Sequence, residues 1–77
     1  GATGDLARRK LLPALFQRDV GGQLPAEAVI VGVARRAMTH DDFRALARAA
    51  IVEHVPGADG AGPDLDRFLA RLHYVVV

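Results

Sequence analysis

Two short, almost wholly apolar runs interrupt the polar pattern of the chain, and both predict β-strands. The first is AVIVGVA at residues 28–34, and the second is LHYVVV at the end of the sequence, where we expect a strand over residues 73–77. Short runs rich in β-branched side chains are typical of strands in a parallel sheet that is covered on both faces. We therefore expect the 28–34 strand to be buried on both faces.

The segment 5–18 is predicted to be helical, because its apolar residues recur at helical spacing. Pro13 cannot donate a hydrogen bond to the carbonyl of Arg9, so we expect a kink or a second helix that begins near Pro13. Gly21 and Gly22 are predicted to end this helical region. The expected apolar stripe consists of Leu6, Leu11, Leu12, Leu15 and Phe16.

Two further helices are predicted between the strands. Thr39 followed by Asp42 resembles a capping box and marks the start of the first. Its expected buried face is Phe43, Leu46, Ala47, Ala50 and Ile51. The glycine- and proline-rich segment 55–63 is predicted to be a loop, and 64–71 a short helix. The charged residues of that helix are expected to form a solvated face: Asp64, Asp66, Arg67 and Arg71.

This alternation of helices and strands predicts the α/β class. More specifically, we expect a partial Rossmann-like dinucleotide-binding fold with parallel strands and crossover helices. A glycine-rich turn of the kind found at Gly1 normally follows a strand, so the first strand is expected to be missing. Residues 1–77 would then be one partial domain, the N-terminal fragment of a larger enzyme.

Composition narrows the range of partners. Ten Lys and Arg residues against nine Asp and Glu residues give a net charge of +1, which provides no overall field for nucleic acid. No apolar run approaches the roughly 20 residues that span a bilayer, so we expect no membrane partner. The chain has no cysteine, which excludes disulfides and thiolate metal sites and is compatible with a reducing cytoplasm. We expect a cytoplasmic protein without a metal site.

The opening GATGDLA is the strongest candidate for a binding motif. Glycine lets a phosphate approach the backbone without meeting a Cβ atom, and the amides of the following helical turn supply donors. The G-x-x-G-x-x-A spacing is related to the dinucleotide fingerprint, whereas the P-loop pattern is absent. Taken alone, the spacing is equally compatible with a structural turn between a strand and a helix.

The two arginines that follow the 28–34 strand favour the binding interpretation. In a dinucleotide fold, the end of the second strand faces the adenosine ribose, and an acidic residue there binds the 2′-hydroxyl of NAD. Because the first strand of the fold is expected to be missing here, the 28–34 strand takes this second place. Here that end carries Arg35 and Arg36, and guanidinium groups suit the 2′-phosphate of NADP. The thirty-four positions from Gly1 to Arg35 exceed the usual spacing of about 20, so the first helix and its loop must be extended.

Three stretches together resemble the N-terminal region of the glucose-6-phosphate dehydrogenase family: GATGDLARRKLLPALF, IVGVARRAMTHDDFR and RLHYVVV. The resemblance covers nearly the whole chain. It implies an enzyme that oxidises glucose 6-phosphate to 6-phosphogluconolactone, with hydride transfer to NADP, in the pentose phosphate pathway. It also implies that the parent enzyme is a homo-oligomer.

The resemblance assigns cofactor-binding roles to nine residues: Gly1, Ala2, Thr3, Gly4, Asp5, Leu6, Ala7, Arg8 and Arg35. The first eight would line the pyrophosphate of NADP, and Arg35 would bind the 2′-phosphate, with Arg36 as a weaker contact. Lys10 matches a family lysine near the junction of coenzyme and sugar phosphate. No catalytic residue is assigned, because the family's catalytic histidine lies beyond these residues.

Two other interpretations remain open at this stage. One is a non-catalytic NADP-sensing module of the NmrA-like or extended short-chain dehydrogenase type, which usually has a third glycine where this chain has Ala7. The other is a structural α/β fragment that binds nothing. The three histidines, His40, His54 and His73, are expected to be solvated or structural.

Overall fold

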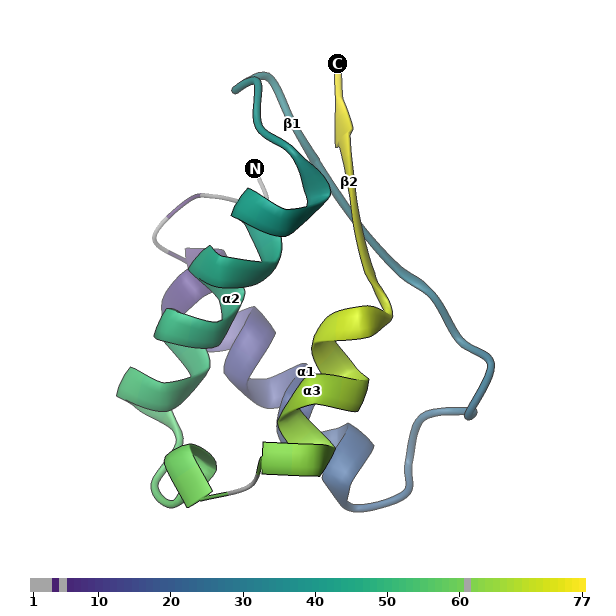
Figure 1. Ribbon diagram of the computed structural model, residues 1–77, viewed down its shortest axis with the longest axis vertical. Helices are drawn as coiled ribbons and strands as arrows, with labels where there is room; N and C mark the ends of the chain where they lie inside the picture. Colours follow the sequence, from purple (N-terminus) through teal and green to yellow (C-terminus); the bar gives the residue numbers. More distant parts are fainter. Residues whose placement is uncertain (1–3, 5, 61) are drawn as a thin grey trace.

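The computed structural model describes residues 4, 6–60 and 62–77. In chain order, the elements are a π-helical turn η1 (Ala7–Leu11), α1 (Leu12–Val20), β1 (Ile30–Ala34), α2 (His40–His54), a 3₁₀ turn η2 (Ala58–Gly60), α3 (Gly62–Ala70) and β2 (Leu72–Val76). The two strands run side by side, and the helices gather on one side of them (Figure 1). The strands are parallel, with Ile30 opposite Leu72 and Ala34 opposite Val76. The predicted α/β alternation with parallel strands and a helical crossover is confirmed.

The first helical region changes its hydrogen-bond pattern ahead of Pro13. The N–H of Leu12 donates to the carbonyl of Ala7, five residues back, which makes Ala7–Leu11 a π-helical turn. The α-helix then begins at Leu12, with Pro13 in its first turn, where the missing N–H of proline costs least. The prediction of a second helix starting near Pro13 is confirmed.

Both ends of helices that were predicted from caps have the expected geometry. The hydroxyl of Thr39 accepts a hydrogen bond of 3.0 Å from the N–H of Asp42 at the start of α2. At the end of α1, Gly22 has a φ of 74°. This left-handed residue lets the N–H of Gln23 donate to the carbonyl of Arg18 at 2.9 Å, which closes a Schellman motif.

The core lies between the helices and the inner face of the two strands. Its largest fully buried side chains come from α2, α3 and β2: Phe43, Phe68, Ile51, Leu65 and Leu72. The ring of Phe16, on α1, meets that of Phe68 edge to face with 5.6 Å between centroids. The face predicted for α2 is buried as expected, with Leu46 half-buried at its margin.

The prediction that both faces of the first strand are buried is wrong. On the outer face of the sheet, Val31, Val33 and Val75 are 53%, 46% and 44% exposed. Along β1, Val31 and Val33 alternate with Gly32 and Ala34, which are buried on the side of the helices. An all-apolar run does not distinguish a strand covered on two faces from one covered on a single face, and in the described chain the helices pack on one face only.

Part of the predicted stripe on the first helix is also wrong. Leu12 and Phe16 are buried and Leu15 is half-buried, but Leu6 and Leu11 are 65% and 53% exposed. The π-helical turn changes the angular spacing of side chains, so the stripe inferred from a regular α-helix does not continue through it. The bounds of some elements also differ slightly from those predicted. The strand predicted over 28–34 begins at Ile30, the helix predicted over 64–71 covers Gly62–Ala70, and the predicted loop 55–63 contains η2.

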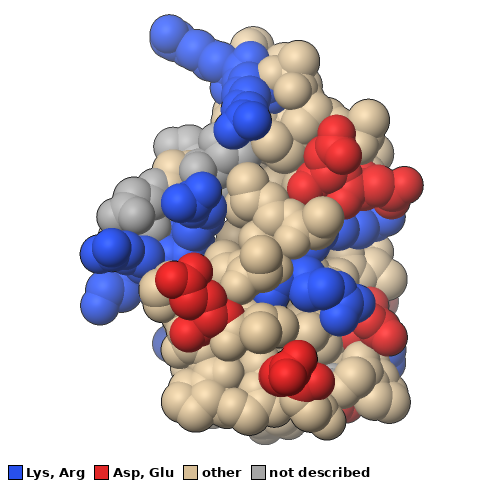
Figure 2. Space-filling model, turned by 60° about the vertical axis from the view of Figure 1, so that its left-hand side comes forward, with Lys and Arg blue, Asp and Glu red and all other residues tan. Residues whose placement is uncertain are grey.

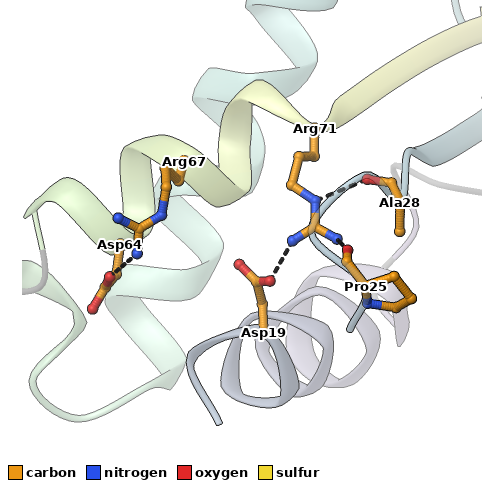
Figure 3. Close-up of polar contacts among 6 residues, drawn as sticks. All are labelled: Asp19, Pro25, Ala28, Asp64, Arg67 and Arg71. Carbon is orange, nitrogen blue, oxygen red and sulfur yellow. Dashed lines mark hydrogen bonds and ion pairs between the residues drawn. The ribbon is translucent and has the colours of Figure 1, made fainter. Parts of the chain in front are cut away.

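Arg71 is not on a solvated face, which corrects a further prediction. Its guanidinium lies between α1 and the segment that leads into β1 (Figure 3). It donates to the carbonyls of Ala28 and Pro25 and pairs with the carboxylate of Asp19. The side chains of Arg71 and Asp19 are each only 15% exposed. The sequence does not show this role, because the three partners lie 43 to 52 positions away along the chain.

Candidate functional site

The candidate site lies at the carboxyl ends of the two strands. In parallel α/β sheets, ligands bind at this end because the loops that follow the strands converge there. Residues 35–39 form the loop between β1 and α2, and both Arg35 and Arg36 are exposed. Within residues 4, 6–60 and 62–77, neither guanidinium has a hydrogen-bond or ion-pair partner. The loop therefore presents two positive charges to solvent.

The surface charge is distributed unevenly. Figure 2 shows basic side chains projecting from the top and the left side of this face, with acidic side chains at its upper right and in its lower part. Separation of this kind leaves a local positive field, even though the net charge of the whole chain is only +1. Such a field suits a small anion better than an extended polyanion.

A groove of about 480 Å³ runs along the free edge of β1. Its lining includes Gly4, Leu6 and Ala7 near the start of the chain, Val31 and Val33 on β1, and Phe43 on α2. Gly4 accepts a 3.1 Å hydrogen bond from the N–H of Arg8, so it directly precedes the first helical turn. Among the predicted pyrophosphate residues, these three are thus gathered in one place.

Arg8 is directed elsewhere. It lines a separate pocket of about 280 Å³, together with Arg9 on η1 and Glu53 and His54 on α2. Lys10 is exposed on the same π-helical turn. The structure therefore brings Gly4, Leu6 and Ala7 together, places Arg8 against α2 and leaves Arg35 in the loop after β1. The remaining predicted site residues, Gly1, Ala2, Thr3 and Asp5, lie outside the described residues.

The two edges of the sheet differ. The hydrogen bonds between β1 and β2 begin with the N–H of Ile30, which donates to the carbonyl of Arg71. They end with the N–H of Val77, which donates to the carbonyl of Ala34. Alternate residues of a strand direct their backbone groups to opposite edges, so Val31 faces away from β2. No described residue bonds to the backbone of Val31 or Val33 on that side.

The outer edge of β2, in contrast, is occupied by side chains of α2. Nδ1 of His40 accepts a 3.0 Å hydrogen bond from the N–H of Tyr74, and Nε of Arg44 donates to the carbonyl of Leu72 at 3.0 Å. Arg44 also donates to the carbonyl of Ala70. Because His40 and Arg44 are four positions apart on the helix, they lie on one face of α2 and follow the strand edge together.

These contacts show what the histidines do. His40 is structural, as expected, and its ring meets that of His73 edge to face at 5.3 Å. His54 lies 3.7 Å from the carboxylate of Glu53. In the described part of the chain, no three acidic or histidine side chains form a group that could hold a metal ion. Nor does any helix there have the length and apolar character needed to span a membrane.

Sequence reasoning missed one residue of the site. Tyr74 is a core residue that is only 6% exposed. Its hydroxyl also donates a hydrogen bond to the carbonyl of Arg36, in the loop of residues 35–39, which we call the arginine loop. The available signal was its chemistry, because a buried tyrosine needs a partner for its hydroxyl group.

Comparison with known proteins places this arrangement in context. A family model described as "Glucose-6-phosphate dehydrogenase, NAD binding domain" matches residues 1–77. The glucose-6-phosphate 1-dehydrogenases of Gluconobacter oxydans and Rhizobium meliloti are 50% and 42% identical to the chain. Each alignment covers the whole chain and 16% of the relative, so the chain spans about a sixth of the length of these enzymes.

A solved structure agrees with this result. The crystal structure of glucose-6-phosphate 1-dehydrogenase from Mycobacterium avium superposes with a TM-score of 0.86 at 36% identity. It covers 100% of this chain, which covers 16% of the solved one. The fold is therefore that of a Rossmann-like dinucleotide-binding domain, and the comparisons support the dehydrogenase interpretation rather than the sensing module.

Proposed function

Because the chain belongs to the glucose-6-phosphate dehydrogenase family along its whole length, we propose that it is the NADP-binding part of such an enzyme. The full-length protein would oxidise glucose 6-phosphate to 6-phosphogluconolactone. Bound NADP would supply the acceptor for the hydride that leaves the sugar. The residues described above bind and orient that cofactor, and the proton of the sugar hydroxyl is taken by a group outside them.

One observation carries the preference for NADP over NAD. The position that follows β1 holds Arg35 and Arg36 and no acidic residue, and neither guanidinium is paired within the described chain. A carboxylate here would accept a hydrogen bond from the 2′-hydroxyl of NAD and repel the 2′-phosphate of NADP. Two guanidinium groups attract that phosphate and can bind it through charge-assisted hydrogen bonds.

The other residues fit the rest of the dinucleotide. Gly4 adds no side chain to the groove beside β1, and the first helical turn follows it directly. An anionic pyrophosphate is favoured at such a position by the free amides and the dipole of the helix. Gly1, Ala2, Thr3 and Asp5 are proposed to complete this turn, and Leu6 and Ala7 to continue it. Arg8, whose side chain lines the pocket beside α2 in this structure, is proposed to turn toward the pyrophosphate when the cofactor binds. Residues 1–77 would thus form part of one domain.

The wider setting of the enzyme is proposed on the family relationship. We place the full-length protein in the cytoplasm, in the pentose phosphate pathway, and as a homo-oligomer. Its substrate would be glucose 6-phosphate, which is the substrate in the names of the relatives. No nucleic-acid or membrane partner is proposed.

The test uses the full-length protein that contains these residues. A charge-assisted hydrogen bond contributes about 1.5–3 kcal/mol, and each 1.4 kcal/mol is about a tenfold change in affinity. The Arg35→Ala variant should therefore bind NADP about 10- to 100-fold more weakly. Its affinity for NAD, which lacks the phosphate, should stay close to that of the wild type. Titration calorimetry with each cofactor gives the ratio of the two dissociation constants.

Two further variants act as controls. Arg36→Ala should change the ratio in the same direction but less, because adjacent residues leaving a strand point in different directions. Gly4→Val places a side chain in the pyrophosphate groove, so it should weaken both cofactors alike and leave the ratio unchanged. An unchanged ratio in Arg35→Ala would show that Arg35 is only a solvated charge, and the assignment to the 2′-phosphate would fail. Absence of turnover of glucose 6-phosphate by the full-length protein would refute the proposed activity.

A further inference from the structure

Tyr74 connects β2 to the arginine loop through its hydroxyl group. The side chain starts on the inner face of β2, opposite Gly32 in the parallel register. Because Gly32 has no side chain, the ring of Tyr74 can lie across β1 toward the loop that follows it. The hydroxyl then donates to the carbonyl of Arg36. This bond joins residues 38 positions apart in the chain.

The base of the Tyr74 side chain is held rigidly. Its ring packs against that of Phe43, with 5.0 Å between centroids and 36° between planes. Its backbone N–H is bonded to Nδ1 of His40. Both contacts come from the first turn of α2, which begins where the arginine loop ends. The hydroxyl group is therefore presented from a fixed position rather than from a mobile surface side chain.

The bond acts on the backbone of the arginine pair itself. The other fixed points of the loop lie beyond it: Met38 packs against the core, and Thr39 caps α2. At the near end, β1 ends at Ala34. Between these limits, a hydrogen bond to the carbonyl of Arg36 restricts the rotation of that peptide group. It thereby restricts the directions in which the two arginine side chains leave the loop.

Such restriction matters for a pair of exposed arginines. Each long side chain loses conformational entropy when it binds a ligand, and ordering a flexible loop backbone at the same time would add to that loss. A backbone that is already fixed in the binding geometry lowers the cost and raises the affinity. The benefit applies only to a ligand that both guanidinium groups contact.

We infer that Tyr74 is a positioning residue for cofactor selectivity, and that its hydroxyl holds the arginine loop in the conformation that binds the 2′-phosphate. This inference rests on the proposed function, in which Arg35 and Arg36 bind that phosphate. Tyr74 itself is not expected to touch the cofactor, because its hydroxyl is engaged with the loop.

The experiment removes the hydroxyl alone, by Tyr74→Phe in the full-length protein. The ring, its packing on Phe43 and the backbone bond to His40 are all retained. Loss of one neutral hydrogen bond should weaken NADP about two- to tenfold, with NAD binding and kcat at saturating NADP unchanged. The readout is again the ratio of the two dissociation constants, measured together with Tm.

A matched control separates positioning from general destabilisation. Phe68→Leu replaces a fully buried aromatic ring of the core, packed on Phe16, with a smaller aliphatic side chain, and should lower Tm without changing the cofactor ratio. A second test combines Tyr74→Phe with Arg35→Ala and Arg36→Ala. If Tyr74 acts through the arginines, the tyrosine change should produce no further shift of the ratio in that background.

The possible results are distinguishable. If Tyr74→Phe lowers Tm but leaves the ratio unchanged while Arg35→Ala alters it, the positioning role is refuted and the proposed function stands. If neither variant alters the ratio, the 2′-phosphate assignment itself fails. A selective loss of NADP affinity that disappears in the arginine-free background supports the inference.

Discussion

The two ends of the sheet use arginine in opposite ways. At the amino end, the side chain of Arg71 is 15% exposed, and its guanidinium is engaged by one carboxylate and two backbone carbonyls. At the carboxyl end, Arg35 and Arg36 are exposed, and their guanidinium groups are unpaired within the described residues. Arginine thus makes hydrogen bonds within the fold at the amino end and is exposed to solvent at the carboxyl end.

This difference shows where binding capacity remains. A guanidinium has five N–H donors, and each donor used internally is lost to a ligand. At the amino end, the bonds of Arg71 hold α1 and the segment before β1 against the start of β2 (Figure 3). At the carboxyl end, Thr39 and Tyr74 make the internal bonds instead, so the guanidinium donors of Arg35 and Arg36 remain available to a ligand.

The largest effect should come from breaking the amino-end cluster with Arg71→Met. The substitution keeps an apolar stem but leaves the carboxylate of Asp19 and the carbonyls of Pro25 and Ala28 without their donor. We expect the free energy of local opening to fall by about 2–4 kcal/mol. Hydrogen exchange of residues 19–34 in the full-length protein measures it. The ratio of NADP to NAD affinity should not change, and a change would show that the two ends are not independent.

A smaller effect is expected from Thr39→Ala, which removes the cap at the carboxyl end. The N–H of Asp42 loses its acceptor, and a cap of this kind contributes about 1 kcal/mol. Faster hydrogen exchange in the first turn of α2 is the measurement. Thr39→Ser keeps the hydroxyl group and should restore slow exchange. Equal exchange in the alanine and serine variants would show that the cap does not stabilise this end.

The smallest effect should come from Arg67→Ala. This variant breaks an exposed Arg–Asp pair, which can be compared with the largely buried pair of Arg71 and Asp19. Arg67 pairs with Asp64 within α3, but the two side chains are 71% and 46% exposed. An exposed pair three positions apart on a helix contributes about 0.2–0.5 kcal/mol. Thermal unfolding of this variant should therefore nearly coincide with that of the wild type. If Arg67→Ala lowered the stability as much as Arg71→Met does, burial would not explain the difference between the Arg67–Asp64 and Arg71–Asp19 pairs.

Local signals predicted the parts of the fold that depend on nearby residues. The cap at Thr39, the end of α1 at Gly22 and the second helix near Pro13 each follow from interactions within a few positions. The exposure of Val31 and Val33 did not follow, because it depends on how many layers cover the sheet. Leu11 was placed wrongly because a π-helical turn cannot be deduced from a hydrophobic stripe.

The candidate site shows the same division. Gly4 and Arg35 were identified from turn chemistry and charge, which are local properties, although their binding roles remain predictions. The roles of Arg71 and Tyr74 were not identified, since they arise from contacts across the fold. In both cases the side chain reaches a backbone carbonyl distant in sequence, and sequence alone does not indicate which carbonyl lies within reach.

The side-chain cover on the outer edge of β2 has a consequence for self-association. Joining sheets edge to edge into a fibre needs two adhesive edges per molecule, as a polymer needs bifunctional monomers. Here His40 and Arg44 occupy the outer edge of β2 near Leu72 and Tyr74, so within the described residues the edge along β1 is the one left open to another strand. Two copies of this part of the chain, paired through β1, would each have no second open edge among the described residues. Edge pairing would therefore stop at a pair, with α2 acting as a chain terminator.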